Sequence, residues 1–415
     1  MPLQHYIDQP TEWTRINRCV IIRGWCFSDD GKPIVHIRLR AGDTMLAGVT
    51  GLYRGDVKEA VPTAPDDNTG FEIRGTLTSG RSEVVIEAAL ENGAWIPIFN
   101  QQVSVKRQFL PLWLGGGEWM QLMFFQMPTH MAYAPRPVKA ETFPKPSAKG
   151  TKPKISIVTP SYQQAAFLEE TIRSVVGQTT VNLEYVVQDG GSTDGSRAII
   201  ERYAPQLSAW SSAPDKGQAD AIATGFTKTT GGPNDLMAWI NSDDTYMPGA
   251  FKYVADYFAQ HPEIDVLYGH RVVINERSEE VARWFLPPHD NTVLKLNDFV
   301  PQETLFWRRR IWDQVGGLNT IFQFAMDWDL LLRFEAIGAN IQRVPYFLAC
   351  FRIHSAQKTA AQMNSIGRGE IDRLRERANQ RIVPSHELET NSRLLKYLRR
   401  SSWIQFLWKW GLRSR

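Results

Sequence analysis

The chain has 415 residues, a length that predicts two or three domains. Hydrophobic residues make up 43% and charged residues 22%, which is typical of a globular protein with a large core and excludes a disordered chain. The net charge of +3 excludes a chain that is strongly basic throughout, as many nucleic-acid-binding proteins are. The cysteines, Cys19, Cys26 and Cys350, form neither a disulfide framework nor a metal-ligand pattern and favour a reducing compartment.

Basic residues gather near the C-terminus. Residues 361–415 contain 12 Arg and Lys but 5 Asp and Glu, a net of +7, which leaves −4 for residues 1–360. The first ten residues lack the basic start and apolar centre of a signal peptide. No run of 18 apolar residues predicts a membrane span. We therefore expect a cytoplasmic protein, with peripheral contact at the inner face of the plasma membrane as an option for the tail.

Residues 1–108 read as an all-β domain. Short alternating runs are separated by turn residues, which favours a small β-sandwich. The runs are residues 19–26, 34–39, 71–77, 84–90 and 95–99. We find no catalytic constellation there, and glycan binding, partner binding and simple packing all remain open. Residues 109–153 are first aromatic and then proline-rich, which is typical of a linker.

Residues 154–360 alternate between strand and helix patterns. This alternation predicts βαβ units and a mostly parallel sheet, hence an α/β fold. Strands are expected at residues 155–159, 183–188, 236–240 and 266–268, and helices at 167–177, 196–203, 219–226 and 248–261. Residues 361–415 read as a basic helical tail interrupted by Pro384.

One strand of this region ends in a turn with adjacent carboxylates, Asn241-Ser242-Asp243-Asp244, called here the acidic turn. The carboxyl ends of strands are where open α/β sheets bind ligands. Two hard oxygen donors suit Mg²⁺ or Mn²⁺ shared with a substrate diphosphate. Taken alone, the segment fits an ordinary Asp-rich turn equally well.

Polar loops also follow the two preceding strands. Thr159-Pro160-Ser161-Tyr162 combines hydroxyls with an aromatic ring that can hold a nucleobase, although a plain turn explains it as well. Asp189 ends the next strand and precedes Gly190-Gly191, a pair that allows close approach of a ligand. Asp189 is the better candidate to accept hydrogen bonds from a base or ribose.

Six runs of residues 154–360 together resemble the inverting glycosyltransferases of family 2, which have the GT-A fold. They occur in the order of that family, at residues 157–162, 189–196, 214–221, 241–244, 325–330 and 352–354. The resemblance implies transfer of a sugar from a nucleotide-diphosphate donor, UDP being favoured, to a glycan or lipid-linked acceptor. It also implies a role in bacterial surface polysaccharide synthesis. The N-terminal domain resembles a small β-sandwich attached to some bacterial glycosyltransferases.

The resemblance assigns the donor and metal sites. Nucleotide-sugar contacts fall on Thr159, Pro160, Ser161, Tyr162, Asp189, Lys216, Asn241 and Ser242. Metal ligands, for Mn²⁺ or Mg²⁺, fall on Asp243, Asp244 and His354. Asn241 stands where the family's motif begins with Asp, so the ligand role moves to the two carboxylates that follow.

The resemblance also assigns the acceptor side. Asp327 matches the catalytic base, in a motif where Met326 replaces the usual Glu. A carboxylate that takes the proton of an attacking hydroxyl supports a single displacement with inversion. Acceptor contacts fall on Gln302, Glu303, Trp328 and Asp329, the last with a structural role as its alternative.

Other functions stay open beside this one. A nucleotidyltransferase would need a phosphate loop rich in glycine and arginine after the first strand, which residues 159–164 lack. A non-catalytic scaffold that binds nucleotide sugar or glycan is the main alternative, and the retained Asp243, Asp244 and Asp327 argue against it. The tail fits either a membrane-surface helix or a helix docked on the catalytic domain or on a second subunit. We expect no nucleic-acid partner, because the tail offers charge without a motif.

Overall fold

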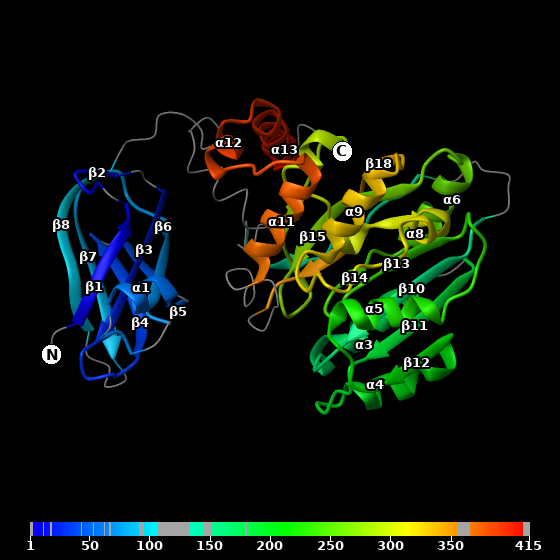
Figure 1. The fold of residues 1–415 in the computed structure, drawn as a ribbon, viewed down its shortest axis with the longest axis horizontal. Helices are drawn as coiled ribbons and strands as arrows, with labels where there is room; N and C mark the ends of the chain where they lie inside the picture. Colours follow the sequence, from blue (N-terminus) through cyan, green and yellow to red (C-terminus); the bar gives the residue numbers. More distant parts are fainter. Residues whose placement is uncertain are drawn as a thin grey trace. The chain divides into compact units, whose positions relative to one another are not determined.

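The computed structural model describes residues 3–105, 133–144, 152–354 and 366–409, apart from residues 11, 17–18, 43, 53, 62, 66–67, 91–94 and 179–180. Most of the expected linker therefore lies outside the described residues. The chain divides into two compact units, residues 1–115 and 116–415 (Figure 1).

The first unit is all-β, as expected. Hydrogen bonds join its eight strands in the single order β1-β3-β6-β5-β4-β7-β8-β2. The strands are β1 Leu3–Gln9, β2 Arg15–Ile16, β3 Cys19–Ser28, β4 Ile34–Ala41, β5 Thr44–Leu52, β6 Gly70–Thr76, β7 Gly80–Leu90 and β8 Trp95–Val105, with one short helix, α1 Gly55–Ala60. All five predicted runs are strands. β5 was not predicted; its side chains alternate between half-buried and exposed, and Leu46 packs against the core of this unit.

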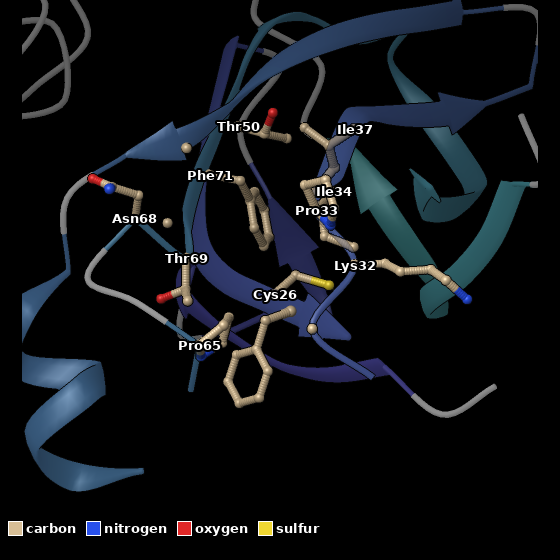
Figure 2. Close-up of a pocket in the computed structure, with 14 residues that line it drawn as sticks. Cys26, Lys32, Pro33, Ile34, Ile37, Thr50, Pro65, Asn68, Thr69 and Phe71 are labelled. Atoms are coloured by element: carbon tan, nitrogen blue, oxygen red, sulfur yellow. The ribbon is translucent and has the colours of Figure 1, made fainter. Parts of the chain in front are cut away.

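A cavity of about 240 Å³ lies in this unit between the ends of β3 and β5 and the starts of β4 and β6. Figure 2 shows Phe71, Ile37 and Pro33 beside Thr50 and Asn68 around it. The hydroxyl of Thr69 is buried there and has no hydrogen-bond partner among the described residues. The Cys26 thiol on its wall is buried, and burial raises its pKa to about 12, so it stays protonated.

The second unit is built on a mixed sheet. Its strand order is β12-β11-β10-β13-β17-β15-β16-β9, and β18 pairs with β14 and β15. The strands β10 to β13 are parallel, whereas β17 runs antiparallel between β13 and β15. The bounds are β9 Arg136–Pro137, β10 Ile155–Ser161, β11 Leu183–Asp189, β12 Ala209–Ser212, β13 Leu236–Trp239, β14 Thr245–Tyr246, β15 Val266–Ile274, β16 Glu279–Trp284, β17 Phe306–Arg308 and β18 Ile341–Arg352. The expected α/β fold is confirmed.

The helices of this unit pack against the sheet through apolar residues on one face. In α3, for example, Leu168, Ile172 and Val175 recur at helical spacing and are buried. The helices are α3 Ala165–Val176, α4 Ser196–Tyr203, α5 Gln218–Thr227, α6 Ala250–Gln260, α7 Asn291–Leu294, α8 Arg309–Val315, α9 Met326–Ala336, α11 Arg368–Asn379, α12 Ser385–Thr390 and α13 Ser392–Lys409, with 3₁₀ turns η1 Ala204–Gln206 and η2 Gln302–Thr304.

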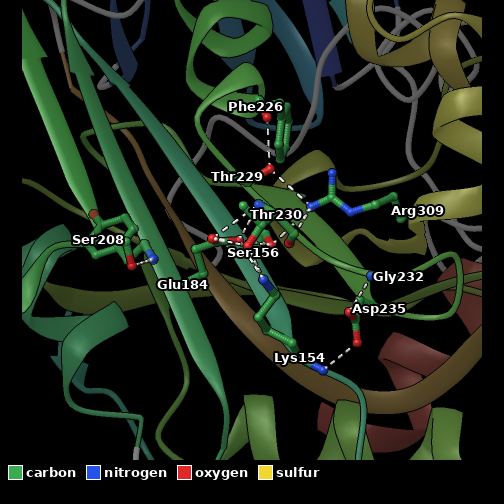
Figure 3. A network of polar contacts seen from close by, with 11 residues as sticks. Lys154, Ser156, Glu184, Ser208, Phe226, Thr229, Thr230, Gly232, Asp235 and Arg309 are labelled. Atoms are coloured by element: carbon green, nitrogen blue, oxygen red, sulfur yellow. Dashed lines mark hydrogen bonds and ion pairs between the residues drawn. The ribbon is translucent and has the colours of Figure 1, made fainter.

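Polar contacts fix the strands at the amino ends of β10, β11 and β13 (Figure 3). Ser156 donates to Glu184 at 2.7 Å, and Asp235 accepts from the backbone N–H of Lys154 at 2.9 Å. Arg309, at the start of α8, donates to the Ser156 hydroxyl at 3.2 Å. These contacts lie at the end of the strands opposite to the polar loops, so they hold the register and leave the carboxyl ends for a site.

The tail is helical, and α13 docks on the second unit. Leu394, Tyr397 and Ser401 are buried, and Ser401 donates to the Phe285 carbonyl at 2.6 Å. The ring of Trp408 lies 5.3 Å from that of Phe285. Among the described helices none has the length and apolarity needed to span a bilayer.

Candidate active site

The polar loops after β10 and β11 lie side by side, because the parallel register pairs Ser161 with Asp189. Thr159 is buried and its hydroxyl shares a 2.9 Å hydrogen bond with Tyr185, while Ser161 is also buried. Tyr162 is 62% exposed, so its ring is available for stacking. Pro160 is buried within the strand.

Asp189 is fully buried and serves its own loop. Its carboxylate accepts from the backbone N–H groups of Gly191 and Ser192 at 3.1 and 2.9 Å. It also accepts from the hydroxyls of Ser192 and Ser212, both at 2.6 Å. Three of these four bonds end on Oδ2 and one on Oδ1, so the carboxylate that the sequence assigned to a base or ribose is engaged mainly by its own loop and by β12. The surroundings of Asp189 therefore indicate that it shapes the loop.

Asp215 is a site residue that the sequence analysis did not single out. A side chain at Gly190 would meet the Asp215 carboxylate at 2.9 Å and the Tyr162 ring at 3.2 Å, so Gly190 keeps open the space between them. Burial raises the pKa of Asp215. Lys216, which follows it, is exposed, and its backbone N–H donates to Asp220 at 3.1 Å. The sequence offered one signal for Asp215, its position beside Lys216 in the family-like run at residues 214–221.

Asn241 lies in a chain of amide contacts. Its carbonyl oxygen accepts from Gln218 at 2.7 Å, and its amide donates to Gln302 at 3.3 Å. Gln302 in turn donates to the Trp239 carbonyl at 2.8 Å. These bonds tie α5, the acidic turn and η2 together and fix the orientation of the Asn241 side chain.

The two carboxylates of the acidic turn have different surroundings. Asp243 lies 3.0 Å from Nε2 of His354, so the acidic turn and the run at 352–354 meet. Asp244 is buried and accepts the backbone N–H of Arg352 at 2.9 Å. Burial, then repulsion from Asp243 and Glu303, raises the pKa of Asp244 well above its usual range. A nearby cation would relieve this repulsion.

Within the described residues, no group of three His, Cys, Asp or Glu side chains has the geometry to hold a metal ion. The Asp243–His354 pair nevertheless offers one carboxylate and one imidazole beyond the carboxyl end of β13, where the Asp243 side chain is 15% exposed and that of His354 is 3% exposed. Such a donor pair fits a divalent ion that takes its remaining ligands from a substrate diphosphate. Asp244, the buried carboxylate that follows Asp243, would add negative charge near such an ion.

Arg352 and Thr171 hold the acidic turn by its backbone, and the sequence analysis gave neither a role. The buried Arg352 guanidinium donates to the Asp243 carbonyl at 2.8 Å. The Thr171 hydroxyl lies 2.9 and 2.7 Å from the carbonyls of Ser242 and Asp244. The conformation of the turn thus depends on β18 and α3 as well as on its own residues.

Asp327 is half-buried in the first turn of α9, where its carboxylate accepts the backbone N–H of Trp328 at 2.9 Å. A second carboxylate, Asp298, was missed by the sequence analysis. Burial, then repulsion from Asp327, raises the pKa of Asp298 well above its usual range. The sequence carried no signal for this proximity, because 29 residues and a strand separate the two.

The residues expected to contact an acceptor are buried. The Trp328 indole donates to the Leu294 carbonyl at 2.8 Å. Asp329 forms ion pairs with Arg333 at 2.8 Å and Arg377 at 2.7 Å, in line with its structural alternative. Glu303 pairs with buried Arg271 at 2.5 Å, and Gln302 bonds to Trp239. These surroundings indicate packing roles rather than contact with an acceptor.

Comparison with known proteins agrees with this geometry. Residues 156–326 match the model of the family described as Glycosyl transferase family 2. They form a family 2 glycosyltransferase domain. The domain has the expected GT-A fold, and the first unit is the expected N-terminal β domain.

The family 2 domain has several curated relatives. It is 30% identical over 198 residues to the O-antigen biosynthesis protein RfbC of Myxococcus xanthus, covering 46% of this chain and 15% of that protein. An uncharacterized glycosyltransferase of Nostoc is 26% identical over 221 residues, covering 49% and 66%. A PGL/p-HBAD biosynthesis glycosyltransferase of Mycobacterium bovis is 28% identical over 195 residues, covering 46% and 73%. The chain thus spans less than two thirds of the first two relatives.

Among solved structures, Staphylococcus aureus TarS in complex with UDP-GlcNAc aligns with a TM-score of 0.46 and 16% identity, over 60% of this chain and 73% of that one.

Proposed function

We propose that this chain is a metal-dependent inverting glycosyltransferase that uses a nucleotide-diphosphate sugar, with UDP as the favoured nucleotide. The acceptor is a hydroxyl of a glycan or a lipid-linked glycan. The family 2 domain supports sugar transfer, and relatives named for O-antigen and PGL/p-HBAD biosynthesis support a cell-surface acceptor.

The acidic turn carries this proposal. Asp243 faces His354 at 3.0 Å beyond the carboxyl end of β13, and burial, then repulsion from Asp243 and Glu303, raises the pKa of Asp244. Asp243 and His354 would hold Mn²⁺ or Mg²⁺, with Asp244 behind them. When bound, a divalent cation neutralises the charge that develops on the leaving diphosphate.

The protein's own residues position the donor. The exposed Tyr162 ring stacks on the base, and Asp215 borders the same space, with Lys216 following it in the chain. Asn241 contacts the nucleotide sugar in the orientation fixed by Gln218 and Gln302. Asp189 supports the donor indirectly, by holding the loop after β11 in place.

Asp327 acts as the general base on the acceptor hydroxyl. Its position in the first turn of α9 leaves the carboxylate partly exposed, whereas Asp329 is turned into the core. The proton moves to the Asp327 carboxylate as the hydroxyl oxygen bonds to the anomeric carbon and the diphosphate leaves. One displacement inverts the anomeric configuration, and no covalent intermediate forms.

Asp327→Asn tests the base. Turnover of a panel of nucleotide sugars with Mn²⁺ should fall about 10²- to 10⁴-fold, the usual contribution of general base catalysis, because the amide cannot take a proton. Asp313→Asn, an exposed change on α8, should turn over like wild type. Equal turnover in wild type and Asp327→Asn would overturn the base assignment, and inactivity of wild type with every donor it binds would favour the scaffold alternative.

Asp243→Ala and Asn241→Ala test the metal. Activity titrated with Mn²⁺ should be lost in Asp243→Ala, because a ligand is gone. Asn241→Ala should keep the wild-type dependence on Mn²⁺, because Asn241 contacts the nucleotide sugar and not the ion. Chelation of divalent ions should abolish wild-type activity. Mn²⁺-dependent turnover by Asp243→Ala would show that other groups hold the ion.

A further inference from the structure

The helix α13 has two chemically different faces. Its inner face packs on the second unit through Leu394, Tyr397, Ser401 and Trp408. Tyr397 lies 4.7 Å from the Phe299 ring, and Trp408 lies beside Phe285. This apolar face is therefore occupied by the protein itself and is not available for insertion into a bilayer. Figure 1 shows α13 and α12 together on the second unit.

The outward face is basic and carries an aromatic ring. Lys396, Arg399, Arg400 and Trp403 are all exposed, and Trp403 is 44% exposed. The three cations precede Trp403 by seven, four and three residues, spacings that place all four side chains on one face of a helix. The whole of α13 contains five Arg and Lys and no Asp or Glu. This set, residues 396, 399, 400 and 403, is called here the basic face.

We propose that the basic face binds the surface of a bilayer rich in acidic phospholipids. Lys and Arg near such a surface are attracted to its negative potential, and Trp prefers the interface between headgroups and hydrocarbon. A nucleic-acid partner fits less well, because residues 1–360 have a net charge of −4, so the excess of positive charge that would attract a phosphate backbone belongs to the tail. Since the inner face is buried, the helix adsorbs to the headgroups while it remains docked.

This inference goes beyond the proposed sugar transfer, and binding to vesicles is measured without turnover. The full chain is sedimented with vesicles of phosphatidylcholine alone or mixed equally with phosphatidylglycerol. We expect binding to the mixed vesicles only, with release as salt is raised. Lys396→Glu/Arg399→Glu/Arg400→Glu should weaken binding at least about a hundredfold, since each cation contributes about fivefold and reversal adds repulsion.

Matched variants keep the test specific. Arg81→Glu/Arg202→Glu/Arg373→Glu makes the same change in net charge at exposed positions outside α13 and should bind like wild type. Trp403→Ala should weaken binding several-fold without altering the salt dependence. Unchanged thermal unfolding of each variant shows that α13 is still docked. Equal vesicle binding by the two triple variants would overturn the proposal. It would also be overturned if single-stranded RNA displaced the wild-type protein from acidic vesicles at a lower concentration than competing lipid does.

Discussion

Arg352 illustrates how one side chain organises the candidate site. It is fully buried, and its guanidinium donates to the Asp243 carbonyl, the Asn275 carbonyl, the Ser278 hydroxyl and the Glu170 carboxylate. A planar group with five donors suits this fan of acceptors, and an ammonium group does not. Arg352 therefore acts as a positioning residue, because it holds the backbone of the turn that presents Asp243.

Arg352→Lys should weaken the apparent affinity for Mn²⁺ about 10- to 100-fold, the usual effect of losing a contact that orients a metal ligand. The maximal rate at saturating Mn²⁺ should change less, because Asp243 and Asp327 remain. The measurement is the dependence of activity on Mn²⁺ concentration. Arg310→Lys, which changes a surface ion pair with Asp265 on the same unit, is the matched control. A Mn²⁺ dependence equal to wild type would show that the turn holds its shape without Arg352.

At the scale of elements, α3 supports the acidic turn from below. Thr171 is buried in the middle of α3, and its hydroxyl lies within hydrogen-bond distance of the carbonyls of Ser242 and Asp244. A hydroxyl on a helix face normally faces solvent or its own helix, so this contact joins two elements that are 71 residues apart. The helix thus fixes the turn together with Arg352, whose guanidinium also pairs with Glu170 of α3.

Thr171→Val should cost about 1–3 kcal/mol of unfolding free energy, because the isosteric methyl leaves a buried carbonyl without a donor. Urea unfolding measures this cost. Thr171→Ser keeps the hydroxyl and should recover most of the hydrogen-bond contribution. If Thr171→Val and Thr171→Ser lose equal stability, the missing methyl group rather than the hydrogen bond determines the effect.

The elements that were predictable are those with local signals. The runs at residues 155–159, 183–188 and 236–240 are β10, β11 and β13, because apolar runs that end in polar loops mark buried parallel strands. The antiparallel β17 was not predictable, because three residues at Phe306–Arg308 carry too little periodicity. The same limit applies to the site. Sequence motifs located Asp243 and His354, whereas the contacts of Thr171 and Asp298 depend on tertiary pairing.

At the scale of the molecule, the second unit contains a histidine that folding keeps neutral. His270 on β15 is 2% exposed between the rings of Phe285 and Phe347, each 5.3 Å away. Its Nδ1 accepts the backbone N–H of Leu286 at 3.1 Å, a bond that needs this nitrogen unprotonated. Burial, then repulsion from Arg343, lowers the pKa of His270 to about 3. Protonation would therefore oppose the folded state.

The sign of the resulting pH dependence follows from linkage. Between about pH 6.5 and pH 3 the unfolded chain binds a proton at His270 and the folded chain does not, so stability falls as the pH falls. One such site contributes a slope of up to about 1.4 kcal/mol per pH unit. His270→Gln removes this proton-binding site. We expect the variant to be less stable at pH 7 but to lose less stability than wild type on acidification to pH 4.5. The measurement is urea unfolding at a series of pH values.

A surface histidine provides the control for this slope. His261→Gln makes the same change at a histidine whose side chain is 41% exposed and paired with Glu263, so it reports the effect of the substitution without loss of a buried imidazole. The difference in slope between His270→Gln and wild type isolates one buried site from the other acid-sensitive groups. An identical slope in both would mean that His270 is protonated in the folded protein. Its bond to Leu286 and its apolar surroundings would then have to rearrange without loss of stability.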